Sequence, residues 1–73
     1  MPKQSCGVRL RFKQLRRMRG TQEQVGRDNG VTGTTIRYIE NGQIVPSGKL
    51  MLRLAKYFGE PVEELFPDVS SSS

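Results

Sequence analysis

The sequence contains no histidine, and Cys6 is its only cysteine. A single thiol cannot close an intramolecular disulfide. Without an imidazole, neither a zinc site nor a histidine-based catalytic triad can be assembled. No other pairing of a nucleophile with a base is evident. The sequence therefore argues against an enzyme, predicts no metal and no cofactor, and favours a reducing, cytoplasmic setting.

Long apolar runs are also lacking. No stretch approaches the run of about 18 apolar residues that a membrane-spanning helix needs. The first twenty positions are basic, but their apolar residues are scattered rather than gathered into the core of a signal peptide. With 73 residues, the chain is expected to form one small domain away from membranes, with a core that is marginal unless it packs efficiently.

Acidic residues are missing from the first twenty positions, although the chain carries a net charge of +5. The balance reverses from Leu54 onward, where Lys56 is the only cation among several carboxylates. A basic end and an acidic end favour a polyanionic partner that is met by one side of the protein only. The alternative is an ordinary solvated helix face. The seven basic residues of the first twenty are Lys3, Arg9, Arg11, Lys13, Arg16, Arg17 and Arg19, and the acidic residues of the last part are Glu60, Glu63, Glu64 and Asp68.

The apolar pattern predicts helices throughout. A first helix is expected from about residue 5 to residue 19, and its apolar face is Val8, Phe12, Leu15 and Met18. Thr21 is the expected N-cap of a short second helix, and Gln24 completes a capping box with it.

A third helix, over about residues 32–41, has Thr32 as its N-cap and buries Ile36 and Ile39. A fourth begins after Ser47 and ends at Gly59. Its apolar stripe is Met51, Leu54, Ala55 and Phe58. A short fifth covers residues 61–66, so the fold class is all-α.

Four glycines lie between positions 26 and 42, although a glycine within a helix costs roughly 0.5–1 kcal/mol relative to alanine. Gly30 supplies a left-handed turn between the second and third helices, which together form a helix-turn-helix unit. Gly26 lets their backbones approach closely, and Gly42 ends the third helix. Gly33 has no such architectural role.

Three regions are expected along the chain. Residues 1–7 form a flexible basic N-terminus, residues 8–67 form the helix-turn-helix domain, and residues 68–73 form a disordered serine-rich tail.

The motifs "TQ" at 21–22, "GV" at 30–31 and "IENG" at 39–42 resemble the phage-repressor-like (Xre, Cro-repressor type) helix-turn-helix family, as does the later "LAKYFGEPVEELF". The resemblance covers residues 8–66 and implies a compact five-helix, lambda-repressor-like DNA-binding domain. The chain departs from the family at four places. Gly20 meets Thr21 directly where a leucine usually intervenes, and Asn29 and Gly48 stand where apolar residues are common. Gly33 stands where the family often has a polar, base-reading side chain.

The resemblance implies that the third helix lies in the major groove of DNA. Its base-reading positions would be Gly33, Thr34, Arg37 and Tyr38, and helical geometry independently places the last three away from Ile36 and Ile39. Gly33 either lets the helix approach DNA more closely or merely loosens its first turn. The implied phosphate contacts are Thr21, Gln22, Asn41 and Gln43, although Thr21 is first of all a cap and Asn41 is equally a helix terminator.

Glu40 would repel DNA unless it were neutralised. The resemblance pairs it with Arg16, and we expect an internal ion pair between them. Other arginines of the first helix are expected on a solvated basic surface beside DNA: Arg9, Arg11, Arg17 and Arg19.

The function predicted is a sequence-specific, double-stranded DNA-binding transcriptional regulator of repressor type, cytoplasmic and encoded by a bacterium or a phage. The alternative is a protein-interaction module, such as an antitoxin or an adaptor, that binds DNA secondarily. No small-molecule ligand is implied. A homodimer on a two-fold operator is expected, because one recognition helix covers few base pairs. Its candidate interface is Leu52, Tyr57, Pro61, Val62 and Phe66. The alternative, favoured for Val62 and Phe66, is that these residues complete the small core.

Overall fold

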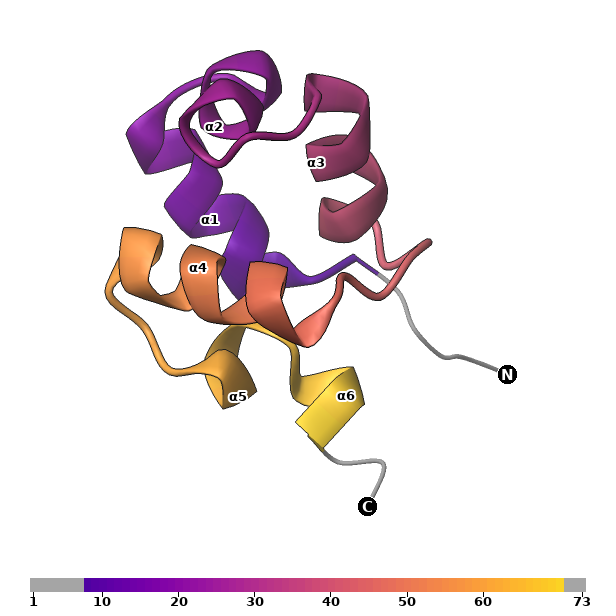
Figure 1. Ribbon diagram of the computed structural model, residues 1–73. Helices are drawn as coiled ribbons and strands as arrows, with labels where there is room; N and C mark the ends of the chain where they lie inside the picture. Colours follow the sequence, from indigo (N-terminus) through magenta and orange to yellow (C-terminus); the bar gives the residue numbers. More distant parts are fainter. Residues whose placement is uncertain (1–7, 71–73) are drawn as a thin grey trace.

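The computed structural model describes residues 8–70, which fold into six helices and, over that range, contain no strand (Figure 1). The all-helical class predicted from the sequence is confirmed. The helices are α1 (Leu10–Arg19), α2 (Gln22–Asp28), α3 (Gly33–Glu40), α4 (Gly48–Phe58), α5 (Val62–Leu65) and α6 (Pro67–Ser70).

Three of these helices begin at the N-caps that the sequence predicted. The Thr21 hydroxyl accepts a hydrogen bond from the backbone N–H of Gln24 (3.1 Å), and Thr32 and Ser47 cap α3 and α4 in the same way. Each such cap satisfies an amide that the helix leaves open, which stabilises the fold by about 1 kcal/mol. The reciprocal half of the predicted capping box is absent, because the Gln24 side chain donates instead to Asp28 (3.0 Å).

One hydrophobic core joins five of the helices. Phe12 of α1 is fully buried and meets the ring of Phe58 edge-on, with ring centroids 5.3 Å apart, and the ring of Phe66 at 5.9 Å. Aromatic side chains of this size dominate the burial that stabilises a small domain. The complete buried set is Phe12, Val25, Ile36, Ile39, Leu54, Phe58, Leu65 and Phe66.

The most extensive packing between two elements joins α2 to α3, and glycine makes it possible. A Cβ atom added to Gly26 would lie 2.8 Å from the backbone of Thr32 and from the carbonyl oxygen of Val31. Gly30 adopts φ 75° in the turn between the two helices, a conformation that favours glycine. The roles predicted for these two glycines are confirmed.

The first helix starts five residues later than predicted. Arg9 precedes α1 in an extended conformation, and its backbone N–H donates to the carbonyl oxygen of Glu40 (2.8 Å). The extended backbone places residue 9 before the helix, as its N-cap, and the bond ties this part of the chain to the end of α3. Val8 and Met18, which were expected on the buried face, are exposed. Residues 5–7 lie outside the described residues.

The ordered part of the chain also extends further than expected at the other end. Residues 67–70 form α6, although a disordered tail was predicted from residue 68. The order has a physical cause: Val69 packs against the core and the Asp68 carboxylate pairs with Arg9. Residues 71–73 of the expected tail and residues 1–7 of the expected flexible N-terminus lie outside the described range.

Arg9 is a buried structural residue, so its predicted place on a solvated basic surface is wrong. Its side chain is 2 % exposed, and Nη1 donates to the carbonyl oxygens of Ile39 (2.6 Å) and Ile44 (2.9 Å). Nε and Nη2 donate to the two carboxylate oxygens of Asp68 (3.0 and 2.8 Å), and the guanidinium lies over the ring of Phe66. A buried charge is tolerated only when it is paired and hydrogen-bonded, and Arg9 meets that condition.

The hydrogen bond from Arg9 holds the pKa of Asp68 below its ordinary value of 3.8. A carboxyl group with a lowered pKa in the folded state stabilises the protein at pH values above its ordinary pKa. That contribution is lost as the pH falls through the lowered pKa, because the proton then binds the unfolded chain more tightly.

Asp68→Asn should therefore lower the thermal unfolding midpoint at neutral pH, since the substitution leaves the Arg9 guanidinium buried without a counter-charge. The difference from the unsubstituted protein should shrink as the pH falls below 3.8. Thermal unfolding followed by circular dichroism from neutral pH into strong acid measures it. A difference that stays constant over that range would show that the ionised carboxylate contributes nothing.

Gly26→Ala should destabilise the fold by about 1–3 kcal/mol, because the added methyl group meets backbone atoms that cannot rotate away. Gly48→Ala is the matched control: Gly48 opens α4, nothing lies within 4 Å of its added Cβ, and a gain of about 0.4–1 kcal/mol is expected. Urea unfolding of both variants measures the two changes. Equal effects from the two substitutions would mean that α2 and α3 do not need their close approach.

Candidate nucleic-acid interface

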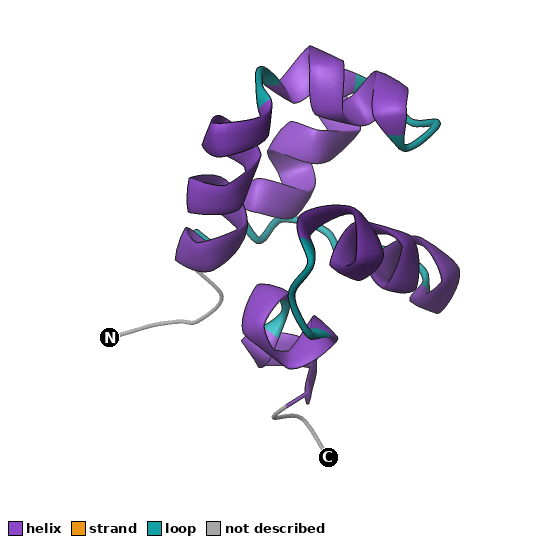
Figure 2. Cartoon of the chain, turned by 90° about the vertical axis from the view of Figure 1, so that its left-hand side faces the viewer, coloured by secondary structure: helices purple, strands orange, loops and turns teal. Residues whose placement is uncertain are grey.

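Helix α3 has one buried face and one exposed face. Ile36 and Ile39 are fully buried in the core, whereas Thr34, Arg37 and Tyr38 are exposed. The exposed face lies beside the start of α2, and both are at the top of Figure 1, at the end of the molecule opposite α5 and α6. In the turned view of Figure 2 the same two ends remain separate. The structure thus presents a short helix with three free polar side chains at one end of the domain.

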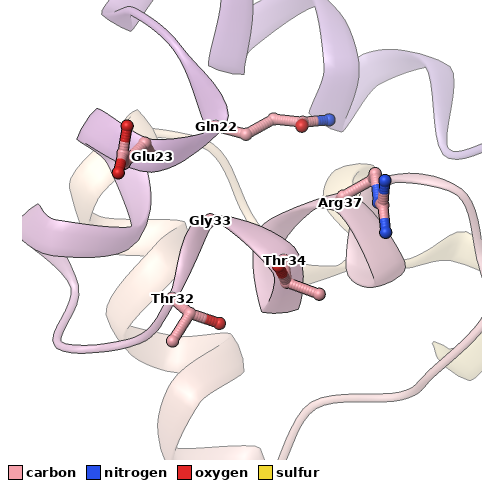
Figure 3. Close-up of a pocket in the computed structure, with 6 residues that line it drawn as sticks. All are labelled: Gln22, Glu23, Thr32, Gly33, Thr34 and Arg37. Atoms are coloured by element: carbon pink, nitrogen blue, oxygen red, sulfur yellow. The ribbon is translucent and has the colours of Figure 1, made fainter.

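A pocket of about 380 Å³ lies between the starts of α2 and α3. Figure 3 shows Glu23 at one side of it and Arg37 at the other, with Gly33 and Thr34 between them. The predicted base-reading residues Gly33, Thr34 and Arg37 are therefore brought together, and Gln22 joins them from α2. The residues that line the pocket are Gln22, Glu23, Thr32, Gly33, Thr34 and Arg37.

Gly33 packs against the backbone of α2. A Cβ atom at this position would lie 2.9 Å from Cα and 3.0 Å from the backbone nitrogen of Glu23, closer than real side chains come. The expectation that Gly33 has no architectural role is wrong, although α3 does begin at Gly33 and is capped by Thr32. The glycine instead lets the starts of α2 and α3 touch, a second close approach besides that of Gly26.

Arg37 and Tyr38 are neighbours in space as well as in sequence. The Arg37 guanidinium lies 5.5 Å from the centroid of the Tyr38 ring, within the range of a cation–π interaction. Arg37 makes no ion pair among residues 8–70, so its hydrogen-bond donors stay available to a ligand. The aromatic ring restricts where the guanidinium lies.

The residues predicted to contact phosphate lie at the two ends of the helix-turn-helix unit. Gln22 is the first residue of α2 and Thr21 is its cap. Asn41 ends α3 with its N–H donating to the carbonyl oxygen of Arg37 (3.0 Å), and Gln43 follows with its N–H bonded to Tyr38 (2.9 Å).

The expected ion pair between Arg16 and Glu40 is present. Arg16 Nε donates to Oε1 of Glu40 (2.8 Å) and Nη2 to Oε2 (3.2 Å), and the Glu40 side chain is 3 % exposed. The two parallel bonds hold both groups in one geometry. The pair joins α1 to the last residue of α3 and neutralises a carboxylate close to the recognition surface.

The basic surface predicted along α1 is present without Arg9, since Arg11, Arg17 and Arg19 are exposed. Besides Arg9, two further arginines of that set have partners: Arg11 pairs with Glu60 (2.7 Å), and Arg19 donates to the carbonyl oxygen of Tyr57 and lies over its ring. Of the four, Arg17 is exposed and makes no such bond within the described chain. The acidic end of the chain folds back toward α1 and neutralises Arg9 and Arg11, but only the charge of Arg9 is buried.

Two residues of the candidate dimer surface complete the core, as the alternative expected. Phe66 is fully buried in the core and is unavailable to a partner, and Val62 packs against the same core. The Tyr57 hydroxyl donates to Asp28 (2.7 Å), and its pKa is raised above 10.0 by burial and by that carboxylate. Leu52 and Pro61 remain exposed.

Sequence reasoning missed Glu23 as a residue of this site. A carboxylate in the first turn of a helix is ordinarily explained by the favourable field of the helix N-terminus, and nothing else in the sequence marks it. Only the contact between Gly33 and α2 places it in the pocket.

Two features are absent from the part of the chain that the structure describes. None of its helices combines the length and hydrophobicity that crossing a bilayer requires. No group of three or more His, Cys, Asp and Glu side chains among these residues is arranged to hold a metal ion.

Comparison with known proteins identifies similar sequences. A family model described as "Helix-turn-helix" matches residues 12–65, which include α2, α3 and their turn. No solved structure matches the chain.

Three relatives are similar over most of their length. The chain is 44% identical over 46 residues to "Uncharacterized HTH-type transcriptional regulator MJ0272" of Methanocaldococcus jannaschii, covering 63% of this chain and 70% of that protein. It is 40% identical over 60 residues to "Uncharacterized HTH-type transcriptional regulator YgzD" of Bacillus subtilis, covering 81% and 91%. An "Uncharacterized HTH-type transcriptional regulator" of Archaeoglobus fulgidus is 35% identical over 60 residues, covering 81% and 84%. Similar proteins therefore occur in archaea as well as in a bacterium.

Proposed function

The chain belongs to the Xre/Cro type of the helix-turn-helix family and is a DNA-binding transcriptional regulator, and we propose that it is a repressor that binds a two-fold operator as a homodimer. The family is non-enzymatic and its fold is the lambda-repressor-like DNA-binding fold. The observation that carries the proposal is the face of α3 beside the start of α2, which no other helix of residues 8–70 covers. A short helix presented in this way fits the major groove of B-DNA.

The proposed base readers are the exposed side chains of α3. Arg37 carries a planar guanidinium that can donate two parallel hydrogen bonds to O6 and N7 of guanine. Thr34 can contact a thymine methyl group or donate to a base, and Tyr38 both orients Arg37 and presents a hydroxyl. Gly33 contributes by its missing side chain, which lets the start of α2 border the same pocket.

The proposed phosphate contacts lie on either side of these readers. Gln22 and the open N–H groups at the start of α2 would contact one phosphate, and Thr21 keeps a hydroxyl proton to donate while it caps the helix. Asn41 and Gln43, just after α3, would contact another. Such contacts position the protein on the duplex without reading its sequence.

The two-fold operator follows from the size of the reading surface. One short helix meets too few base pairs to select a site in a genome, and a dimer doubles the contact. Its half-sites would lie about 34 Å apart, one turn of the DNA helix. Leu52 and Pro61 are the exposed apolar residues from which we expect the contact between subunits. Repression results where the occupied operator overlaps a promoter.

Arg37→Ala should weaken binding to the preferred duplex by about 1–3 kcal/mol and relax the base preference at one or two positions. Gln22→Ala should weaken binding to all duplexes by similar factors, because a phosphate contact is common to them. Selection from random duplexes followed by affinity measurements on each variant tests both expectations. If Gln22→Ala relaxed a base preference and Arg37→Ala weakened binding to all duplexes alike, Gln22 would be the base reader and Arg37 the phosphate contact.

Sedimentation with a palindromic duplex should show two protein chains per duplex at saturation. Leu52→Asn should weaken the binding of the second chain, since Leu52 is 60% exposed and its loss does not open the core. Leu10→Asn is the control, because Leu10 is similarly exposed (69%) and lies on α1. One chain per duplex at saturation would exclude the dimer.

A further inference from the structure

Glu23 is a carboxylate without an assigned purpose at the proposed DNA-binding surface. It lines the pocket between α2 and α3, it is exposed, and its side chain makes no hydrogen bond or ion pair among residues 8–70. Glu40, the other acid close to α3, is neutralised by Arg16. An unneutralised carboxylate beside phosphates weakens binding, so Glu23 either opposes DNA binding or meets a hydrogen-bond donor on the DNA.

The packing of Gly33 brings the backbone of Glu23 to the edge of the pocket. Because position 33 has no side chain, the backbone of Glu23 can come very close to it. The Cα atom of Glu23 lies only 2.9 Å from the point that a Cβ atom at position 33 would occupy. The space that a side chain at the start of α3 would fill is therefore bordered by α2. Figure 3 shows Glu23 on one side of that space and Arg37 on the other.

The two sides of the pocket therefore differ in their hydrogen-bonding groups. The Glu23 carboxylate is an acceptor at one side, and the Arg37 guanidinium supplies donors at the other. The bases also differ in the hydrogen-bond donors and acceptors that they present in the major groove. Guanine presents only acceptors there, and thymine presents an acceptor and a methyl group. Adenine places an acceptor next to its amino group. Cytosine presents the N4 amino donor alone. A carboxylate opposite cytosine gains a charge-assisted hydrogen bond, and opposite guanine or thymine it meets an acceptor.

We propose that Glu23 is a specificity-determining residue that accepts a hydrogen bond from N4 of a cytosine, while Arg37 reads a guanine nearby. The inference rests on the proposed function, since it needs α3 in the major groove. In this arrangement Glu23, which belongs to α2, supplies the base contact that Gly33 of α3 cannot make. The recognition surface then consists of two helices rather than one.

The experiment starts from the duplex that the unsubstituted protein selects from a random pool. Glu23→Ala should lower the affinity for that duplex by about tenfold or more and remove the preference for cytosine at one position, leaving the positions read by Arg37 unchanged. Glu63→Ala is the matched control. Glu63 is an exposed acid of α5 at the opposite end of the molecule, so its loss should alter no base preference.

A modified base tests the atom itself. Replacing the critical cytosine by N4-methylcytosine exchanges the groove-facing proton for a methyl group. The unsubstituted protein should bind the modified duplex about tenfold more weakly, whereas Glu23→Ala should bind both duplexes equally. An equal loss for the two proteins would overturn the proposal, because the methyl group would then act through another residue.

An unchanged or increased affinity of Glu23→Ala for DNA would also overturn the proposal. If Glu23→Ala binds every duplex as tightly as before or more tightly, with all preferences intact, Glu23 faces phosphates and reads nothing. In that case sequence-specific binding survives and only the inference fails. If the unsubstituted protein selects no sequence at all, the proposed function fails, and the inference fails with it.

Discussion

The buried guanidinium of Arg9 is the interaction on which the rest of the structure depends. It is bonded to the end of α3, to the loop before α4 and to α6. Taking a charge out of water is unfavourable by several kcal/mol, and only a complete set of acceptors offsets it. The arginine therefore requires all three segments to be in place together. Arg16 adds a second bond at the same end of α3 through Glu40, so the C-terminal end of this helix is held from α1 by two side chains.

The other end of α3 is held by contacts of the opposite kind. Gly26 and Gly33 remove side chains where α2 and α3 meet, and the backbones themselves come into contact. Ion pairs at one end and close backbone packing at the other leave α3 little freedom to rotate. The exposed side chains of α3 are thereby presented in one fixed orientation, which is what a regulator needs to distinguish one base from another.

Local signals in the sequence were sufficient for much of the fold. The caps Thr21, Thr32 and Ser47 and the turn at Gly30 depend on a few neighbouring residues, and the sequence predicted them correctly. The role of Arg9 depends on partners 30, 35 and 59 positions away, and charge alone does not distinguish a buried arginine from a solvated one. The order of α6 was missed for the same reason. Gly33 and Glu23 required the crossing of two helices in three dimensions. The site was thus predictable where the family motif names a position, and unpredictable where one helix brings a residue into the space of another.

The bond between Arg9 and Asp68 also bears on how the protein is made. A ribosome releases the chain from its N-terminus, so α1, α2 and α3 emerge well before the residue that completes the Arg9 network. Until Asp68 appears, the guanidinium has only carbonyl oxygens to bond and the end of α3 lacks its full support. A nascent chain that already carries the helix-turn-helix unit therefore cannot yet hold it in its final form. The helix-turn-helix unit therefore gains its full support only after α6 has been synthesised.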